Sequence, residues 1–339
     1  MNTTLSDHSS QSSLFNFVVY TDDARRLEYF QKIVHVVVEQ YPCQVLFLLA
    51  EEKKDRDHIE VKQQGRITLI EASGKDISRI PYLFFRHLVP GIPIYLLWGQ
   101  EPFSDDPILP YLEQYCTRLI YDSESCEHLF KMARKLISRK AHLHGDIIDM
   151  NWARGAGWRR VLSQTFDCSE RLESLQNAKE IRIKFNSHHT MPFHHCETQS
   201  YYLQAWLGAL FDWKFKESSI DGSSRKLIYS RKEQEEVIIE LVAEEREELH
   251  PGAIISFECN SFHDHHYLIH RLKDNLHQVR VEITMEVTCE LPFAIPLPPS
   301  SAGMVLLREI LFTPPSDHYL LMMEALAQLD TPYLEEVLR

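Results

Sequence analysis

The feature that most constrains the fold is the alternation of short apolar runs with helical segments from residue 14 to residue 139. Strand-length apolar runs occur at 14–20, 44–49, 66–70, 92–98 and 118–121. The segment between the first two, 22–40, carries its apolar residues at helical spacing. Nearly continuous apolar strands separated by helices are typical of parallel sheets covered on both faces. We therefore expect a doubly wound, Rossmann-like α/β domain with a mostly parallel sheet over residues 14–145, after a polar, disordered leader over residues 1–13.

The pattern changes after residue 145, where apolar and polar residues alternate with a period of two. Such stretches occur at 180–185, 226–230, 236–242, 253–259 and 278–288. Period-two alternation is typical of antiparallel strands with one buried face. Helical segments are expected at about 197–213 and 317–329. The sequence therefore predicts a second, α+β domain with an antiparallel sheet over residues 146–339.

Charge and hydropathy limit the classes of partner. The chain has 36 Lys and Arg against 49 Asp and Glu, a net charge of -13, which disfavours nucleic acid and anionic membrane surfaces. No apolar run approaches the roughly 20 residues of a membrane-spanning helix, and the N-terminus lacks a signal-peptide pattern. The seven cysteines are scattered without a C-x-x-C pair. We expect a cytoplasmic protein with reduced thiols.

The first strand–helix turn argues against a bound dinucleotide. Such a site needs glycines, because backbone N–H groups must approach the pyrophosphate closely. This turn instead reads Thr21-Asp22-Asp23-Ala24. Two carboxylates at a helix N-terminus complement the helix dipole themselves and repel phosphate. We expect no nucleotide cofactor.

Histidine-rich clusters raise the possibility of a metal site. They comprise His142 and His144; His188, His189, His194 and His195 with Cys196; and His263, Asp264, His265 and His266. Adjacent histidines in an extended segment point to opposite sides, and no H-E-x-x-H helix supports a zinc centre. No G-x-S-x-G turn indicates a nucleophile. We predict neither a metal nor a catalytic site, with a pH-sensitive surface and, more weakly, a zinc protein left open.

The most unusual segment is Asp149–Arg160, DMNWARGAGWRR. In one interpretation, Trp152 and Trp158 fill the seam between the two domains while Arg154 and Arg159 satisfy carboxylates or carbonyls. In the other, the four residues form a partner-binding hot spot, because Trp and Arg dominate such sites. Trp98 is the last residue of the apolar run 92–98, and ligands of open α/β sheets usually bind at such strand ends. Trp98 is therefore also a candidate, either as a binding residue or as part of the core.

This segment resembles the family of glucose-6-phosphate dehydrogenase assembly proteins, OpcA. The family's W-x-R-x-x-x-W-R stretch matches Trp152–Arg159. Further matches lie in order along nearly the whole chain, at Leu88–Trp98, Arg118–Ser123, Gln204–Leu207 and Leu326–Leu338. No cysteine lies in a matched motif, so no cysteine role is transferred.

The resemblance implies a two-domain protein that performs no turnover, associates with glucose-6-phosphate dehydrogenase and promotes its active oligomer. It would thereby act as an allosteric activator in the oxidative pentose phosphate pathway. It does not imply that this chain binds NADP or sugar phosphate. The alternative is a regulatory sensor that binds a sugar phosphate at the strand ends near Trp98.

Overall fold

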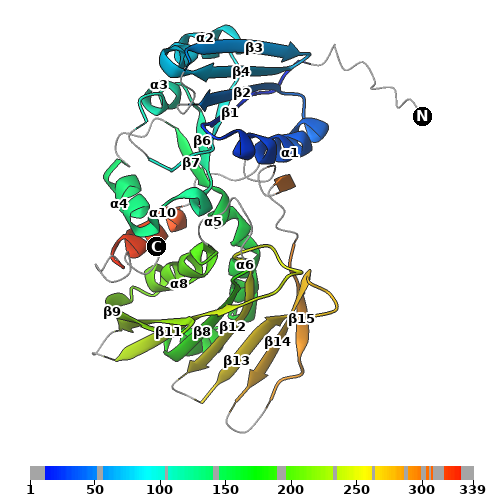
Figure 1. Cartoon of the computed structure of the whole chain (residues 1–339). Coiled ribbons are helices and arrows are strands. Elements are labelled where there is room, and N and C mark those ends of the chain that lie inside the picture. The colour runs from blue at the N-terminus through cyan, green and yellow to red at the C-terminus, as the bar shows by residue number, and fades with distance from the viewer. Residues whose placement is uncertain are drawn as a thin grey trace, which may run out of the picture. The chain divides into compact units, whose positions relative to one another are not determined.

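A computed structural model describes residues 12–51, 56–103, 106–139, 145–188, 196–231, 235–261, 264–285, 289–298, 303–304, 307 and 317–329 (Figure 1). The chain divides into two compact units. The first comprises residues 1–122, 142–149 and 302–314, and the second comprises 123–141, 150–301 and 315–339. Both units are therefore assembled from separate stretches of chain. The single boundary expected at residue 145 stays a prediction.

The first unit is built on a seven-stranded sheet of order β3-β4-β2-β1-β5-β6-β7. All neighbouring strands are parallel except β3 and β4. This arrangement confirms the expected doubly wound, mostly parallel sheet. The strands are β1 (Asn16–Thr21), β2 (Gln44–Glu51), β3 (His58–Gln64), β4 (Ile67–Ser73), β5 (Ile94–Trp98), β6 (Arg118–Tyr121) and β7 (Asp146–Asp149).

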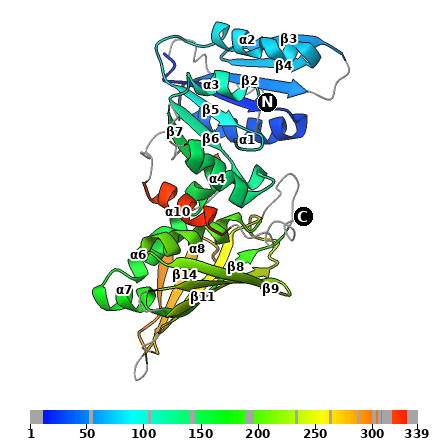
Figure 2. The same ribbon diagram turned by 90° about the vertical axis from the view of Figure 1, so that its left-hand side faces the viewer.

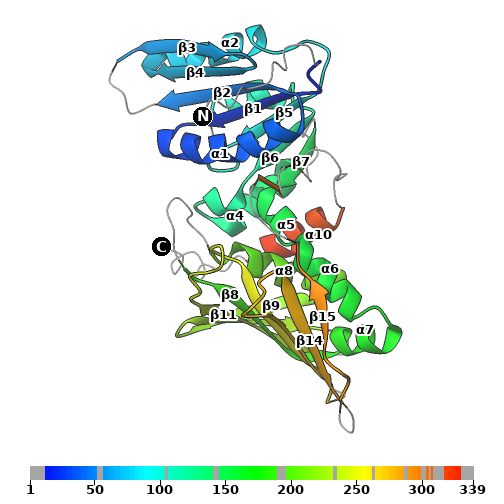
Figure 3. The ribbon, with the colours of Figure 1, turned by 90° about the vertical axis from the view of Figure 1, so that its right-hand side faces the viewer.

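Helices cover both faces of this sheet. The helix α1 (Ala24–Gln40) packs on β1 and β2, while α2 (Ile80–Arg86) and α3 (Leu109–Glu113) lie on the opposite face (Figures 2 and 3). A short 3₁₀ helix, η1 (Gly74–Arg79), leads into α2. The strand order reverses direction beside β1, so right-handed crossovers place α1 on one face and α2 and α3 on the other.

The second unit is built on an eight-stranded sheet of order β15-β14-β13-β12-β8-β11-β10-β9. Only β8 and β11 pair in parallel, so the expected α+β class with an antiparallel sheet is confirmed. The strands are β8 (Ala178–Asn186), β9 (Lys214–Asp221), β10 (Ser224–Ser230), β11 (Glu236–Glu244), β12 (Ile254–Ser261), β13 (His266–Arg271), β14 (Gln278–Thr284) and β15 (Phe293–Pro296).

One face of this second sheet is covered by helices. The central helix α8 (Thr198–Leu210) packs on β8 and β11, and its residues from Thr198 to Gly208 are all buried. The end of α6 (Ala156–Thr165) reaches the same face, where Phe166 contacts Phe257 and Tyr267. The helices are η2 (Ser123–Ser125), α4 (Leu129–Arg139), α5 (Met150–Arg154), α6 (Ala156–Thr165), α7 (Ser169–Gln176), α8 (Thr198–Leu210) and α10 (Asp317–Ala327). None of the helices described is both long and apolar enough to span a membrane.

The helix α4 belongs to the second unit, although its sequence follows the strands of the first. Its apolar stripe includes Phe130, Met132 and Leu136, and the helix packs against α10. Phe130 also meets Tyr201 of α8, with the ring centroids 5.2 Å apart. An amphipathic stripe shows which face is buried but not which surface buries it.

Candidate functional site

Trp98 is part of the core at the carboxyl edge of the first sheet. Its side chain is 1% exposed and stacks on Tyr20 of β1, with ring centroids 4.4 Å apart and planes within 5°. The indole Nε1–H donates to the carbonyl oxygen of Glu101 at 3.2 Å. These two rings occupy part of the edge at which ligands usually bind in sheets of this class.

Acidic groups line the same edge. The side chain of Asp23 caps α1 by accepting from the backbone N–H of Arg25, and the Tyr20 hydroxyl donates to Asp106 at 3.3 Å. Burial raises the pKa of Asp22, and burial together with the Asp106 charge raises that of Tyr20. A carboxylate that caps a helix satisfies the N–H groups that would otherwise bind phosphate.

Gly99, directly after β5, is required for packing. A Cβ at this position would overlap the ring of Phe30 and lie 2.8 Å from the carbonyl oxygen of Tyr20. The guanidinium of Arg26 donates to the Gly99 carbonyl at 2.9 Å. Because side chains of α1 fill this position, the glycine does not open space for a pyrophosphate.

The tryptophan–arginine segment folds into α5 and α6, and its first arginine is enclosed. The side chains of Arg154 and Glu124 are each 1% exposed and lie 3.4 Å apart. Arg154 also donates to Asn151 Oδ1 at 2.9 Å, and Asn151 donates to the Ser123 hydroxyl at 3.0 Å. Arg154 is therefore held by side chains of the second unit. Its contact with Glu124 agrees with the first interpretation of this segment, in which Arg154 satisfies a carboxylate or a carbonyl.

The second arginine of this segment reaches back to the first tryptophan. The Arg159 guanidinium lies 3.4 Å from the Trp152 ring centroid and donates to the Trp152 carbonyl at 2.7 Å. Gly155 permits this approach, because a Cβ there would lie 3.0 Å from Arg159 Nη1. Trp152 also packs on Tyr319 of α10, with ring centroids 5.6 Å apart.

The candidate residues of this segment thus fall into two classes of exposure. Trp158 is buried beside Leu162, and Arg154 is buried beside Glu124, so neither can touch a partner in this conformation. Trp152 and Arg159 are half-buried and retain some accessible surface. Their role in partner contact or in a domain seam remains a prediction.

The histidines do not converge within the described part of the chain. His188 pairs with Glu245 at 3.1 Å, His266 with Glu258 at 3.0 Å, and His265 Nδ1 lies 2.9 Å from the Ser174 hydroxyl. No three potential metal ligands come together among the described residues. His142, His144, His189, His194, His195 and His263 lie outside those residues.

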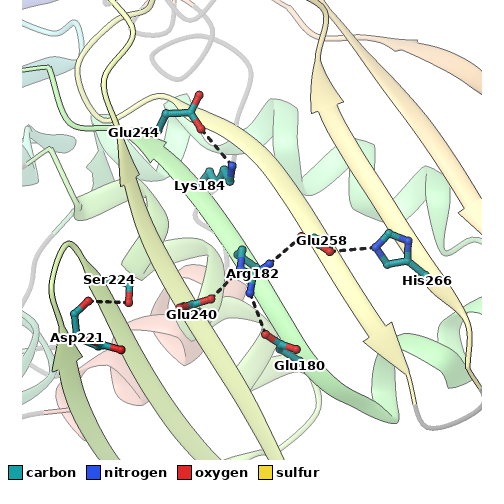
Figure 4. Close-up of polar contacts among 9 residues, drawn as sticks. All are labelled: Glu180, Arg182, Lys184, Asp221, Ser224, Glu240, Glu244, Glu258 and His266. Carbon is teal, nitrogen blue, oxygen red and sulfur yellow. Dashed lines mark hydrogen bonds and ion pairs between the residues drawn. The ribbon is translucent and has the colours of Figure 1, made fainter.

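The face of the second sheet opposite α8, here called the outer face, carries a charge network that the sequence argument missed (Figure 4). Arg182 of β8 donates to Glu240 of β11 at 2.7 Å, to Glu180 at 3.2 Å and to Glu258 of β12 at 3.4 Å. Lys184 pairs with Glu244 at 3.2 Å. The sheet register places Arg182 directly between Glu240 and Glu258. The alternating charged residues Glu180, Arg182 and Lys184 on β8 indicated an exposed charged face. Their glutamate partners on β11 and β12 could not be predicted, because they depend on the order of the strands in the sheet.

A comparison with protein families identifies the second half of the chain. Residues 146–326 match the family model described as the C-terminal domain of the OpcA glucose-6-phosphate dehydrogenase subunit, and this match covers just over half of the 339 residues. The chain belongs to this family, the glucose-6-phosphate dehydrogenase assembly protein (OpcA) family. The resemblance drawn from Trp152–Arg159 and the flanking motifs is thereby confirmed.

Curated relatives named as OxPP cycle protein OpcA agree with this assignment. The relative from Synechococcus elongatus is 23% identical over 197 residues, which are 53% of this chain and 42% of the relative. The relative from Nostoc punctiforme is 20% identical over 231 residues, 62% of this chain and 47% of the relative. The chain thus spans less than half the length of these relatives.

Solved structures with a similar fold are oxidoreductases. KijD10, a 3-ketoreductase from Actinomadura kijaniata in complex with NADP, has a TM-score of 0.55 at 10% identity and matches 93% of this chain and 95% of its own. UDP-N-acetylglucosamine 3-dehydrogenase GnnA from Acidithiobacillus ferrooxidans has a TM-score of 0.54 at 8% identity, over 97% of this chain and all of its own. At such identities the likeness shows the fold alone.

Proposed function

We propose that this chain is a non-catalytic partner of glucose-6-phosphate dehydrogenase that binds the enzyme in the cytoplasm and favours its active oligomer. The observation that carries the proposal is the family match over residues 146–326, which includes the tryptophan–arginine segment and all eight strands of the second sheet. The names of the curated relatives place them in the OxPP cycle, which agrees with such a partner.

The residues at the edge of the first sheet support a protein without dinucleotide chemistry of its own. A hydride-transferring relative of this fold needs room and N–H groups for a pyrophosphate after its first strand. Here Asp23 takes the capping N–H, the Tyr20–Trp98 stack fills part of the edge, and Phe30 occupies the position beside Gly99. We therefore do not propose for this chain the oxidoreductase activity of the solved structures with a similar fold.

A partner of this kind activates by binding one state of the enzyme more tightly than another. It shifts the equilibrium only by the ratio of its affinities for the two states. Raising a minor active form from 1% to 99% of the enzyme would need a ratio of about 10⁴. The proposal thus requires a measurable difference in affinity and not binding alone.

The test combines the purified chain with the purified dehydrogenase of the same organism. Light scattering after gel filtration should show a complex and a shift toward the larger enzyme oligomer, and the KM for glucose 6-phosphate should fall. Identical elution and identical kinetics with and without the chain would refute the proposal.

The matched control measures the chain without its partner. Calorimetry with glucose 6-phosphate and with 6-phosphogluconate should give no binding heat, because the edge near Trp98 is acidic and filled. Saturable heat with either compound would favour the alternative of a sugar-phosphate sensor.

A further inference from the structure

Large aromatic side chains gather on one face of the first unit. Tyr82 is 79% exposed, and Phe85, Tyr111 and Tyr115 are each between 45% and 57% exposed. Together they are called the aromatic patch. Single exposed apolar residues are common on protein surfaces, whereas a contiguous group of rings marks a surface that another molecule covers.

Two of these rings share one face of α2, and the other two lie at α3. Tyr82 and Phe85 are three residues apart within α2, whereas Tyr111 lies in α3 and Tyr115 in the turn two residues after its end. The rings of Phe85 and Tyr115 meet edge to face, with centroids 4.5 Å apart. This contact joins the two pairs, and α2 and α3 lie on the same side of the sheet (Figure 2).

The opposite faces of these helices are anchored in the core, which fixes the patch in place. Ile80 and Phe84 of α2 and Leu109 and Leu112 of α3 are each at most 1% exposed. The outward rings therefore cannot turn inward without displacing buried side chains. A rigid aromatic surface loses little conformational entropy when it binds, which favours its use as a docking site.

The charges beside the patch indicate the kind of partner that fits. Lys75, Arg79 and Arg86 lie in η1 and α2 with one acidic residue, Asp76, so this stretch carries a charge of +2 (three cations less one anion) in a chain of -13. Arg79 pairs with Asp76 at 3.1 Å. Arg86 is exposed and makes no ion pair with any residue that the structure describes. A covering surface should therefore supply carboxylates.

This charge pattern disfavours a second copy of the chain. A two-fold dimer through the patch would bring the basic stretch of one copy against the same stretch of the other, and like charges across an interface oppose association. A different protein with an apolar surface bordered by carboxylates avoids this repulsion.

We propose that the aromatic patch is the surface through which this chain docks on glucose-6-phosphate dehydrogenase. The inference rests on the proposed function and adds to it the contact surface and the chemistry of the opposing face, apolar and bordered by acidic residues. It moves the expected contact from the tryptophan–arginine segment, whose Arg154 and Trp158 are buried, to the exposed rings on α2 and α3.

The test measures the affinity of the full chain for the purified dehydrogenase in three variants. Tyr82→Ala and Tyr111→Ala, combined, should weaken binding by about 30-fold, as expected when central aromatic side chains are removed from an interface. Arg86→Glu should weaken binding mainly through a slower association rate, and raising the salt concentration should reduce this effect. Leu172→Ala, which removes an exposed apolar side chain from α7, outside the aromatic patch, is the control and should change the affinity less than twofold.

The outcomes separate this inference from the proposed function. If the unaltered chain does not bind the dehydrogenase, the proposed function fails. If it binds and the patch variants bind equally well at an unchanged melting temperature, the docking surface lies elsewhere and only this inference is overturned. If the chain alone dimerises and Tyr82→Ala abolishes the dimer, a second copy covers the patch and the inference is again overturned.

Discussion

Two arginines of the second unit face glutamates in very different surroundings. Arg154 and Glu124 are both 1% exposed, whereas Arg182 on the outer face is 37% exposed and shares three glutamates, Glu180, Glu240 and Glu258. The distances are comparable, 3.4 Å for the buried pair and 2.7–3.4 Å for the network on the outer face. Burial is thus the main difference between them.

This difference separates a structural pair from a solvated surface. Removing one partner of a buried pair leaves an uncompensated charge in a medium of low dielectric constant, while water screens the survivor of an exposed pair. The motif arginine Arg154 therefore has its main effect on folding. A third pair, Arg225 with Glu197, is intermediate, with side chains 12% and 21% exposed. The three pairs form a series in which burial predicts the cost of deletion.

The largest effect is expected for Arg154→Ala. This substitution leaves Glu124 buried without its cation and should lower the free energy of unfolding by about 3–5 kcal/mol. Urea denaturation followed by circular dichroism measures this loss. Adding Glu124→Gln to the same variant should restore part of the stability, because the buried carboxylate that Arg154 faces is then replaced by a neutral amide. If Arg154→Ala lost less than about 1 kcal/mol, burial would not predict the cost of deleting an arginine in these pairs.

Arg225→Ala should have an intermediate effect. Arg225 makes two 2.9 Å contacts to the carboxylate of Glu197, one from Nη2 and one from Nε. Glu197 directly precedes the first residue of α8. Glu197 keeps partial access to water, so we expect a loss of about 2 kcal/mol in the same denaturation experiment. The comparison with Arg225→Lys tests geometry, because lysine keeps the charge but cannot make the bidentate contact. Equal stability of the two variants would show that charge alone matters.

Arg182→Ala should cost less than about 1 kcal/mol, despite the three carboxylates around Arg182, because exposed ion pairs contribute little. The loss should shrink further in concentrated salt, which screens surface charges. Parallel melts of this variant and the unaltered chain at low and high salt provide the measurement. A loss as large as that of Arg154→Ala would show that exposure does not govern the series.

Much of the fold could be predicted from the sequence because its signals are local. The continuous apolar run of β2 indicated a strand buried on both faces, and the period-two alternation of β8 indicated a strand with one buried face. The two sheets have the strand types that these patterns predict. The membership of α4 in the second unit was not predictable. Its stripe of Phe130, Met132 and Leu136 packs against α10, about 190 residues away in the chain.

The candidate site was predictable only in part. The spacing of Trp152, Arg154, Trp158 and Arg159 marked the segment, but no local pattern shows that Glu124 lies beside Arg154 or that Trp158 is enclosed. The aromatic patch escaped notice for a related reason. In the sequence IPYLFFR of α2, Phe84 and Phe85 are adjacent and alike, and only the packing of the helix decides which one is buried.

The smallest effect is expected from Glu244, at the margin of the outer face. Its partial burial acts to raise its pKa, but hydrogen bonds from Arg246 and Lys184 outweigh this and lower the pKa below the ordinary value of 4.5. A carboxyl with a lowered pKa in the folded state adds stability above pH 4.5, and that contribution is lost as the pH falls through the folded-state pKa. Glu244→Gln should therefore be less stable than the unaltered chain at pH 7 by less than about 1 kcal/mol, and the free energies of unfolding of the two proteins should converge in acid.

Glu217→Gln on β9 is the matched control, because Glu217 is exposed and pairs with no described residue. This substitution should leave the profile of stability against pH unchanged. A difference for Glu244→Gln that persists at low pH would mean that the side chain acts through packing, so the outer face would not be the solvated surface inferred from Arg182.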